Sequence, residues 1–577
     1  MDVAALLEKG LACHAAGQLG DAARCYRAVL EREPDNPDAL NLMSSLVLMT
    51  GDAAQAANLA AQAIRAQPDW FAPYIALGNA LQSAGRADQA ADMFREALRL
   101  NPRSAEAHCN LSSAFNALGR FDEAVMAAVE AIVLNGELVQ AHTNFGNALM
   151  GLGNAGEAVE AFLKVVALTP EDAEGWYNLG SAYAALDQPE EAVASLRRSA
   201  QLRPSAPAFY NLGNVLLRDD RPVEAEAAFR AAADLAPDWP DVPVNLAAAL
   251  ADQGRVGEAE GILRHVAAII PDMADAHFNL ALLLLRQGRF QEGWKEYEWR
   301  WQRPDFQPLR RPFVQPQWDG GELAGRTLLI TAEQGFGDAL QHCRFIAEVA
   351  RRGARVVLEC RPGLTRLLAG VEGVAEVVEL GAELPSFDLH VPLLSLPHLL
   401  GVAVGDLPGR VPYLAVPPGT DDFADFAAGS EIKVGLVWAG SASRDRDRRR
   451  SLSPADLAPL LAVPGCRFHS LQVDGEPAPA PVVTLVERLG DFADTAAAVA
   501  ALDVVISVDT AVAHLAGALG KPVWVMLSTP CDGFLWMDGR DDSPWYPSAR
   551  LFRQERGGDW GGVVAAVAHA LAGFTRS

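Results

Sequence analysis

The sequence predicts an α-solenoid followed by an α/β domain of two lobes, each built on a parallel sheet. Along roughly the first 300 residues, small, large and turn-forming residues recur with a period close to 34. A fixed period of this length is typical of stacked helical hairpins. Beyond residue 325, apolar runs of strand length alternate with helical segments, as in doubly wound parallel sheets.

One asparagine recurs at a matching position in six consecutive units. The steps are 34, 34, 33, 34 and 34 residues, and the members are Asn110, Asn144, Asn178, Asn211, Asn245 and Asn279. Most units also close with a proline, namely Pro34, Pro68, Pro102, Pro170, Pro204, Pro237 and Pro271. In the third unit, Gly78 and Ala90 allow two helices to approach, and the Phe94 ring fills the space that they leave.

This pattern resembles the consensus of the tetratricopeptide family, in register over about nine units and residues 1–301. The resemblance implies a solenoid that holds another protein. A carboxamide both donates and accepts hydrogen bonds, so we hypothesise that the asparagine row binds the backbone of an extended acceptor protein. The row looks like the asparagine ladder of eukaryotic protein O-GlcNAc transferase, and Asn79, Asn147 and Asn214 would widen it. The alternative is structural, because asparagine here can tie neighbouring helices together.

The ninth unit departs from the pattern and carries an aromatic stripe. Gly293 keeps the small position, but Trp294, Tyr297, Trp299 and Trp301 follow at helical spacing. One interpretation is a seam that docks the solenoid onto the next domain. The other is the ordinary aromatic core of a capping repeat.

Composition argues against several classes of partner. The net charge is −25 and the pI is about 4.9, whereas nucleic acids and anionic membranes attract basic faces. No apolar run reaches the about 18 residues needed to span a bilayer, and the N-terminus lacks a secretory signal. The seven cysteines are scattered singly, which favours reduced thiols over disulfides or a zinc site. We expect a cytoplasmic protein that neither binds nucleic acid nor inserts into a membrane.

The organisation changes after Trp301. Residues 302–325 are rich in proline and form either a linker or a docked irregular segment. Candidate strands follow at residues 327–331, 355–359, 375–380, 432–438, 467–471, 503–508 and 522–527. A break within 415–430 separates an N-terminal lobe, 326–428, from a C-terminal lobe, 429–577. Ligands bind at the carboxyl ends of parallel strands, so we expect the site between the lobes.

The first candidate site segment follows the first predicted strand and contains Gly335, Gly337 and Asp338. The glycines let the backbone turn tightly and approach a ligand. Asp338 is expected to begin a helix, either as a carboxylate at the mouth of the cleft or simply as its N-cap.

Two neighbouring segments of the C-terminal lobe offer candidate phosphate ligands. A strand that runs into Gly440 and Ser441 can form a phosphate cradle from backbone amides. Residues 444–451 contain five arginines, whose guanidinium forks suit phosphate oxygens. Arg450 and Ser451 are preferred because they lie nearest the following helix. The alternative is a solvated loop of alternating charge.

The fourth segment joins the predicted strand 503–508 to a helix and contains Asp509, Thr510, Ala511 and His514. The amides of Thr510 and Ala511 would lie at a helix N-terminus, which favours anions. Asp509 is expected to cap this helix, with His514 one turn on. Capping alone explains Asp509 and Thr510, but it does not explain a histidine in an otherwise apolar helix.

Residues 318 to about 560 resemble bacterial glycosyltransferases related to the heptosyltransferases, whose GT-B fold has two Rossmann-like lobes. The matching strings are EQGFGDALQ, VGLVWAG, DTAVAHLAGALGKPVW and DSPWYP. The resemblance implies that Asp338 is the catalytic base and that Asp509, Thr510 and His514 bind the donor phosphates. Residues 531–536, CDGFLW, replace a tryptophan-arginine-tryptophan cluster often found in related chains, so the preferred donor can differ.

A solenoid joined to such a domain resembles the bacterial flagellin glycosyltransferases. These enzymes attach nonulosonic acids such as pseudaminic acid to serine or threonine. The resemblance implies a protein O-glycosyltransferase that uses a nucleotide sugar, with a CMP-linked donor and flagellin as candidates. Asp338 would act as base, while His514 and Arg450 stabilise the departing phosphate without a metal or cofactor. The alternatives are a glycosyltransferase that acts on an envelope glycan and a non-catalytic tetratricopeptide adaptor.

Overall fold

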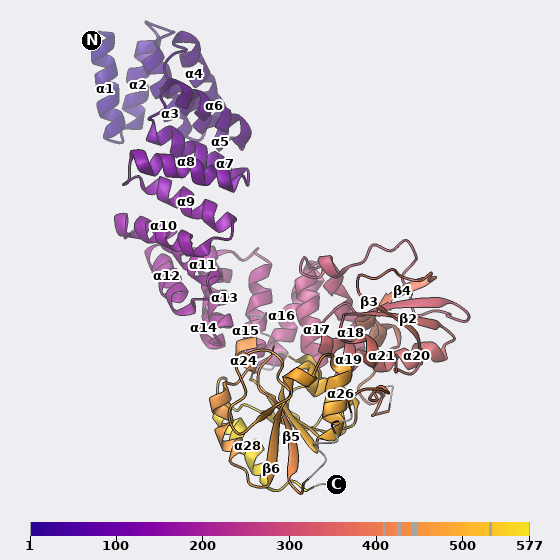
Figure 1. Cartoon of the computed structure of the whole chain (residues 1–577). Coiled ribbons are helices and arrows are strands. Elements are labelled where there is room, and N and C mark those ends of the chain that lie inside the picture. Colours follow the sequence, from indigo (N-terminus) through magenta and orange to yellow (C-terminus); the bar gives the residue numbers. More distant parts are fainter. Residues whose placement is uncertain are drawn as a thin grey trace. The chain divides into compact units, whose positions relative to one another are not determined.

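The computed structural model describes residues 2–407, 410–421, 423, 429–440, 447–529 and 533–575. The chain divides into two compact units, Met1–Pro237 and Asp238–Ser577. Figure 1 shows stacked helices in the first unit, and both helices and sheets in the second.

The first unit is a series of helical hairpins. Its helices are α1 (Val3–Ala15), α2 (Leu19–Leu30), α3 (Pro37–Met49), α4 (Ala53–Ala66), α5 (Ala72–Ser83), α6 (Ala87–Leu100), α7 (Ala105–Ala117), α8 (Phe121–Leu134), α9 (Val139–Gly151), α10 (Ala155–Leu168), α11 (Ala173–Ala185), α12 (Pro189–Leu202), α13 (Ala206–Arg218) and α14 (Pro222–Leu235). The predicted α-solenoid is therefore confirmed.

Small residues let the two helices of a hairpin approach closely. A Cβ atom built on Gly78 would lie 2.4 Å from the Phe94 ring, and one on Gly146 would lie 2.6 Å from the Phe162 ring. Both rings are almost fully buried. The glycine is thus required because the aromatic ring of the second helix occupies the space of its side chain.

The second unit begins with two more hairpins and an irregular segment. The helices are α15 (Asp241–Asp252), α16 (Val256–Ile269), α17 (Ala274–Arg286), α18 (Phe290–Tyr297) and the 3₁₀ turns η1 (Glu298–Gln302) and η2 (Gln307–Leu309). Within 302–325, Trp318 and Leu323 are buried, and the Trp318 amide donates to the His390 carbonyl. This segment is docked on the sheet that follows. The expected boundaries of the domains stay predictions.

Two parallel sheets follow. The first has the order β3-β2-β1-β4 and the second β10-β9-β8-β5-β6-β7. Their strands are β1 (Thr327–Thr331), β2 (Arg355–Cys360), β3 (Val374–Glu379), β4 (Leu389–Pro392), β5 (Ile432–Val437), β6 (Cys466–Ser470), β7 (Val483–Thr484), β8 (Val504–Val508), β9 (Val523–Leu527) and β10 (Ala549–Arg553). All seven predicted strands are present, with ends within one residue. The short strands β4 and β7 and the arginine-flanked β10 were not predicted.

Helices flank both sheets. They are α19 (Phe336–His342), α20 (Ile346–Arg351), α21 (Thr365–Leu368), α22 (Leu396–Leu399), α24 (Asp447–Arg450), α25 (Ala458–Leu461), α26 (Phe492–Ala501), α27 (Ala511–Ala518) and α28 (Trp560–Ala572). One apolar core runs from Trp294 and Tyr297 of α18 through the first sheet to α27. The C-terminal region is therefore an α/β domain whose core includes Trp294 and Tyr297 of the aromatic stripe, but not Trp299 or Trp301.

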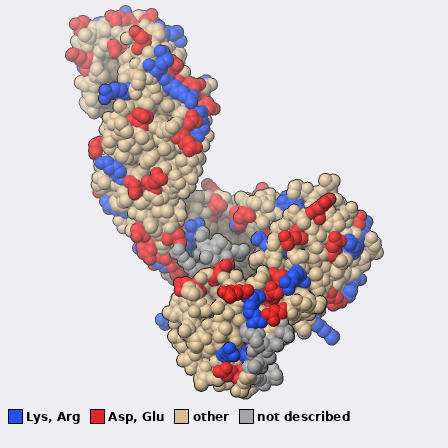
Figure 2. Space-filling view, in the orientation of Figure 1, with Lys and Arg blue, Asp and Glu red and all other residues tan. Residues whose placement is uncertain are grey.

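The surface is acidic overall but locally mixed. On the face shown in Figure 2, basic and acidic side chains are interspersed. No helix in the described part of the chain is long and apolar enough to cross a membrane.

Candidate functional site

The N-termini of α19 and α27 meet at the carboxyl ends of the two sheets. A Cβ atom built on Gly337 would lie 3.0 Å from Cδ2 of His514 and 3.6 Å from Cα of Ala511. Gly337 follows β1 of the first sheet, whereas Ala511 and His514 follow β8 of the second. The absence of a side chain at Gly337 thus lets the two predicted site segments contact one another.

Asp338 lies in the first turn of α19, which begins at Phe336 and not, as expected, at Asp338. Its carboxylate accepts a hydrogen bond of 3.0 Å from the Gly335 amide. The N-cap position belongs to Gly335, so Asp338 stabilises the turn from inside the helix. Asp338 is only partly buried. A carboxylate in this position is fixed by the backbone and still accessible.

His514 is the buried polar centre of the site. Its Nδ1 lies 3.1 Å from the Tyr546 hydroxyl, and its Nε2 lies 3.8 Å from Oδ1 of Asp509. Burial lowers the pKa of His514 from its usual value, Asp509 opposes this shift, and Arg450 reinforces it. The imidazole is therefore neutral near pH 7. When the Tyr546 hydroxyl donates to Nδ1, the proton of His514 resides on Nε2, beside Asp509 and Gly337.

Asp509 does not cap α27, contrary to expectation. Thr510 occupies the N-cap position, and its hydroxyl lies 2.9 Å from that of Ser507. Oδ1 of Asp509 instead accepts a 2.8 Å hydrogen bond from the indole nitrogen of Trp536. The Trp536 ring also stacks on His514, with centroids 5.0 Å apart and planes 14° apart. Trp536 belongs to η7 (Phe534–Trp536). The sequence pointed to its segment, 531–536, but did not predict its contacts with Asp509 and His514.

The phosphate cradle expected at Gly440 is partly occupied by the protein itself. The Gly440 amide donates a 3.1 Å hydrogen bond to the Ser451 hydroxyl, so these two predicted residues contact each other. Ser441 lies outside the described residues. Arg450, at the end of α24, is close enough to His514 to lower its pKa. A cationic group therefore lies near the N-terminus of α27.

A buried ion pair lies behind the Asp338 loop. The Arg300 guanidinium is fully buried and lies 3.2 Å from Oε1 of Glu333, whose other oxygen accepts the Leu393 amide at 3.0 Å. Burial raises the pKa of Glu333 above its usual value. Arg300 opposes this shift, whereas the Asp338 carboxylate adds to it. Glu333 and Asp338 are thus close enough to interact.

His342 binds the backbone of Asp338. Its Nδ1 lies 2.9 Å from the Asp338 carbonyl, and because a carbonyl only accepts, Nδ1 donates. Burial lowers the pKa of His342 to about 3, with the Asp338 hydrogen bond opposing this shift. The Trp294 ring meets the His342 ring edge to face at 5.6 Å. Trp294 of the aromatic stripe therefore packs against the histidine that binds the Asp338 carbonyl.

The asparagine row makes hydrogen bonds between successive repeats. Nδ2 of Asn110 donates to Asn79, Nδ2 of Asn144 to the Cys109 carbonyl, and Nδ2 of Asn211 to the Tyr177 hydroxyl, at 2.9, 3.0 and 3.0 Å respectively. Each partner lies on the first helix of the preceding hairpin. This pattern favours the structural interpretation at these three positions. Binding of a protein by the row remains a prediction, as it does for Asn178, Asn245 and Asn279.

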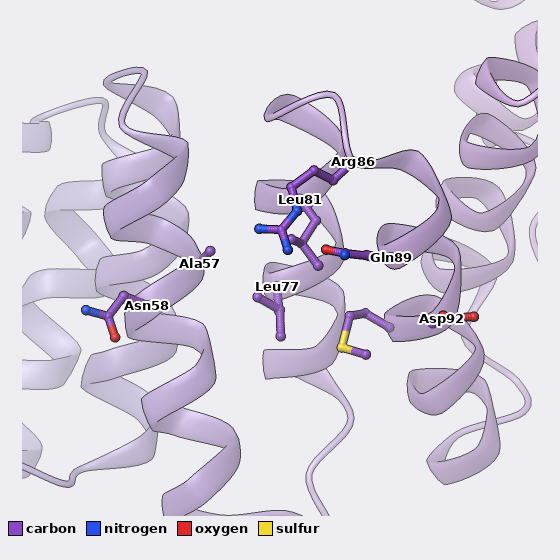
Figure 3. A pocket seen from close by; sticks show the side chains of 8 residues that line it. Ala57, Asn58, Leu77, Leu81, Arg86, Gln89 and Asp92 are labelled. Carbon is purple, nitrogen blue, oxygen red and sulfur yellow. The ribbon is translucent and has the colours of Figure 1, made fainter.

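A groove recurs on the first unit. In Figure 3, Ala57 of α4 points toward Leu77 and Leu81 of α5, and the groove that these residues line has a volume of about 450 Å³. A second groove, of about 350 Å³, is lined by the corresponding leucines, Leu212 and Leu216 of α13. The repeat therefore reproduces, at two places along the solenoid, a groove in which leucines lie beside polar and charged side chains.

Comparisons with known proteins identify the repeats. Models of the tetratricopeptide repeat match residues 14–81, 75–137, 143–207, 216–272 and 274–293. This chain contains tetratricopeptide repeats. These tetratricopeptide matches fall within the segment from α1 to α18 and precede β1.

The relatives cover part of the chain. Protein FlbA of Caulobacter vibrioides (strain ATCC 19089 / CIP 103742 / CB 15) is 29% identical over 323 residues, which cover 50% of this chain and 53% of FlbA. The chain thus spans about half the length of this relative. Among solved structures, the APC/C hetero-tetramer Cut9–Hcn1 is 20% identical with a TM-score of 0.39, covering 48% of this chain and 55% of that one. TTC0263 of Thermus thermophilus, a tetratricopeptide protein, is 25% identical with a TM-score of 0.28, covering 31% and 98%.

Proposed function

We propose that this protein is an O-glycosyltransferase that moves a sugar from a nucleotide-sugar donor to a serine or threonine of a protein acceptor. One observation carries the proposal: the Asp338 loop of the first sheet abuts the α27 N-terminus of the second, at Gly337 and His514. A partly exposed carboxylate thus lies beside a helix N-terminus with a buried imidazole. This combination suits base-assisted transfer from a phosphate leaving group.

In the proposed reaction, the donor phosphates lie at the N-terminus of α27, near Arg450 and His514. Asp338 takes the proton of the acceptor hydroxyl while the hydroxyl oxygen bonds to the anomeric carbon. The bond from that carbon to the phosphate oxygen breaks, and the nucleotide leaves with the electron pair. The free amides of the first turn, Arg450 and the Nε2–H of a neutral His514 stabilise the new negative charge.

The acceptor is proposed to be a protein because the chain contains tetratricopeptide repeats, and such repeats commonly bind another polypeptide. The energy of binding to the solenoid would offset much of the entropy that is lost when the acceptor hydroxyl is brought to the donor. Flagellin and a CMP-linked nonulosonic acid are the proposed acceptor and donor. Both follow from the resemblance of the whole domain combination to flagellin glycosyltransferases.

The first test is calorimetric titration of the purified chain with CMP, UDP, GDP and ADP. We expect one nucleotide to bind and His514→Ala to abolish this binding. His569→Ala is the matched control, because His569 is exposed on α28 of the same sheet's flank and should leave affinity unchanged. Binding of CMP supports a nonulosonic acid donor, whereas UDP supports a hexosamine-type transfer. No binding to any of the four would favour a non-catalytic adaptor.

The second test separates the base from the donor site. Asp338→Asn keeps a side chain that can accept the Gly335 amide but cannot take a proton at neutral pH. We expect turnover to fall at least about 100-fold, the size of a lost general base, while nucleotide affinity is unchanged. Asp319→Asn, in the docked segment, is the control carboxylate.

Retained turnover in Asp338→Asn would remove this residue from the role of base. The acceptor class is read from the product: labelled sugar on a protein supports the proposal, and labelled sugar on an envelope glycan supports the alternative transferase.

A further inference from the structure

We propose that the last helical hairpin, α17–α18 with η1, is a positioning element that holds both walls of the candidate site. The first wall is the loop at residues 333–338, and the second wall is the segment at residues 534–538. This inference rests on the proposed function for its catalytic meaning, but its structural part does not. The hairpin contacts the loop that precedes Asp338 and the segment that carries Trp536. It would thereby make the end of the repeat series a component of the site.

The first wall is held by Tyr297 and Arg300. The Tyr297 hydroxyl accepts a 2.9 Å hydrogen bond from Nε2 of Gln334, the residue before Gly335, whose amide binds Asp338. Arg300 binds the adjacent Glu333 and also donates to the Ser395 hydroxyl at 2.8 Å. Both Tyr297 and Arg300 are buried. Because buried hydrogen-bonded groups move little, they fix the loop that orients the Asp338 carboxylate.

The second wall is held by Arg286. Its guanidinium is bidentate on Asp538, with Nε 3.1 Å from Oδ2 and Nη2 3.0 Å from Oδ1, and its carbonyl accepts the Asp538 amide at 3.0 Å. A Cβ atom built on Gly288, in the hairpin turn, would lie 2.7 Å from Cε of Met537. Trp536 directly precedes these residues. The hairpin thus clamps the segment that presses the indole onto His514 and Asp509.

Aromatic packing joins the two clamps. The Phe534 ring lies 5.8 Å from both the Trp294 and the Tyr297 rings, and Trp294 also meets His342 beneath Asp338. One short helix therefore touches both walls at once. A shift of this hairpin would move Asp338 and Trp536 together, and a misplacement of about 1 Å can cost about 100-fold in rate.

The clamps are tested with variants of the full chain. Arg286→Ala should loosen Trp536, expose His514 and weaken about tenfold the binding of whichever of CMP, UDP, GDP and ADP the unchanged chain binds, whereas Arg286→Lys should restore part of the affinity. Tyr297→Phe removes only the hydroxyl; it should lower turnover about tenfold through Asp338 and leave nucleotide affinity unchanged. Losses of about tenfold are typical when the changed residue orients a site residue but does not itself touch the ligand. Arg289→Ala is the control, since Arg289 pairs with Glu260 and Glu292 on the repeats.

A readout without donor or acceptor separates this inference from the proposed function. Nuclear magnetic resonance of the histidine Cε1–H groups follows the titration of His514, with His514→Gln for assignment. The titratable and charged groups that act on the ring are Asp509, Arg450, Tyr546 and His342, and neither Arg286 variant nor the control changes any of them. We expect Arg286→Ala to raise the titration midpoint toward that of a free histidine, and Arg289→Ala not to. An unchanged midpoint in Arg286→Ala and Arg286→Lys, with unchanged affinity, would overturn the inference; a shifted midpoint without nucleotide binding would overturn only the proposed function.

Discussion

At the scale of single residues, the candidate site combines carboxylates with histidines whose protonation state is set by burial. Burial keeps the rings of His342 and His514 neutral, because the interior penalises a charged imidazole. The single N–H of neutral His342 donates a hydrogen bond to the Asp338 carbonyl, so this ring orients the backbone. Its proton is therefore not available for transfer. His514 instead faces the contact with Gly337, and its action on a donor belongs to the proposed function.

His342 predicts a specific loss of stability in acid. Its folded pKa, about 3, lies far below the ordinary value of about 6.5, so the unfolded chain binds a proton that the folded chain refuses. The stability contributed by neutral His342 is complete above pH 6.5 and is lost as the pH falls toward 3. Between pH 7 and pH 5 the free energy of unfolding should drop by roughly 2 kcal/mol from this residue. Denaturant titration of His342→Phe should show that part of the pH dependence removed; an identical pH dependence in both proteins would contradict the assignment.

At the scale of elements, glycines decide how closely helices approach. Gly146→Ala in α9 places a methyl group against the Phe162 ring and should destabilise the first unit by about 1–3 kcal/mol. Gly156→Ala in the next helix meets nothing within 4 Å and should be neutral or slightly stabilising, because alanine favours helix. Urea unfolding of the two variants measures the difference, and equal effects would show that the ring yields without cost.

The contact between α19 and α27 makes a second prediction at this scale. Gly337→Ala brings Cβ to 3.0 Å from the His514 ring, so it should weaken the contact between the two helices. We expect the free energy of unfolding to fall by about 1–3 kcal/mol. Nucleotide binding should weaken as well. Gly405→Ala, an exposed glycine with open space, is the matched control. Thermal melts and nucleotide titration of both variants provide the measurement. Unchanged affinity in Gly337→Ala would show that the donor site does not depend on the close approach.

At the scale of the whole molecule, the division into two compact units predicts separable unfolding. Of the 12 tryptophans, only Trp70 and Trp176 lie in the first unit. Tryptophan fluorescence therefore reports mainly the second unit, whereas helical circular dichroism reports both. We expect the two probes to give different midpoints in urea. Coincident transitions would mean that the units unfold as one.

The sequence by itself determined the local pattern of this protein. The 34-residue period, the glycine–aromatic pairs and the seven longer apolar runs are local signals, and each produced the element expected from it. The strands β4 and β7 escaped because four and two residues carry too little pattern, and β10 because arginines flank its apolar centre. Asp338, Asp509 and His514 were also chosen from sequence, by the loop and helix around them.

Only the tertiary structure decided how these residues are used. The carboxylate of Asp509 binds an indole 27 positions away, and Arg300 pairs with Glu333 across 33 positions. Such partners depend on which surfaces the packed sheets and helices bring together, and no local period encodes that. The asparagine row shows the same limit: its spacing was evident, but the amides of Asn110, Asn144 and Asn211 bind the neighbouring repeat because stacking places an acceptor within reach. Periodicity fixes which face a side chain occupies, and packing fixes what that face meets.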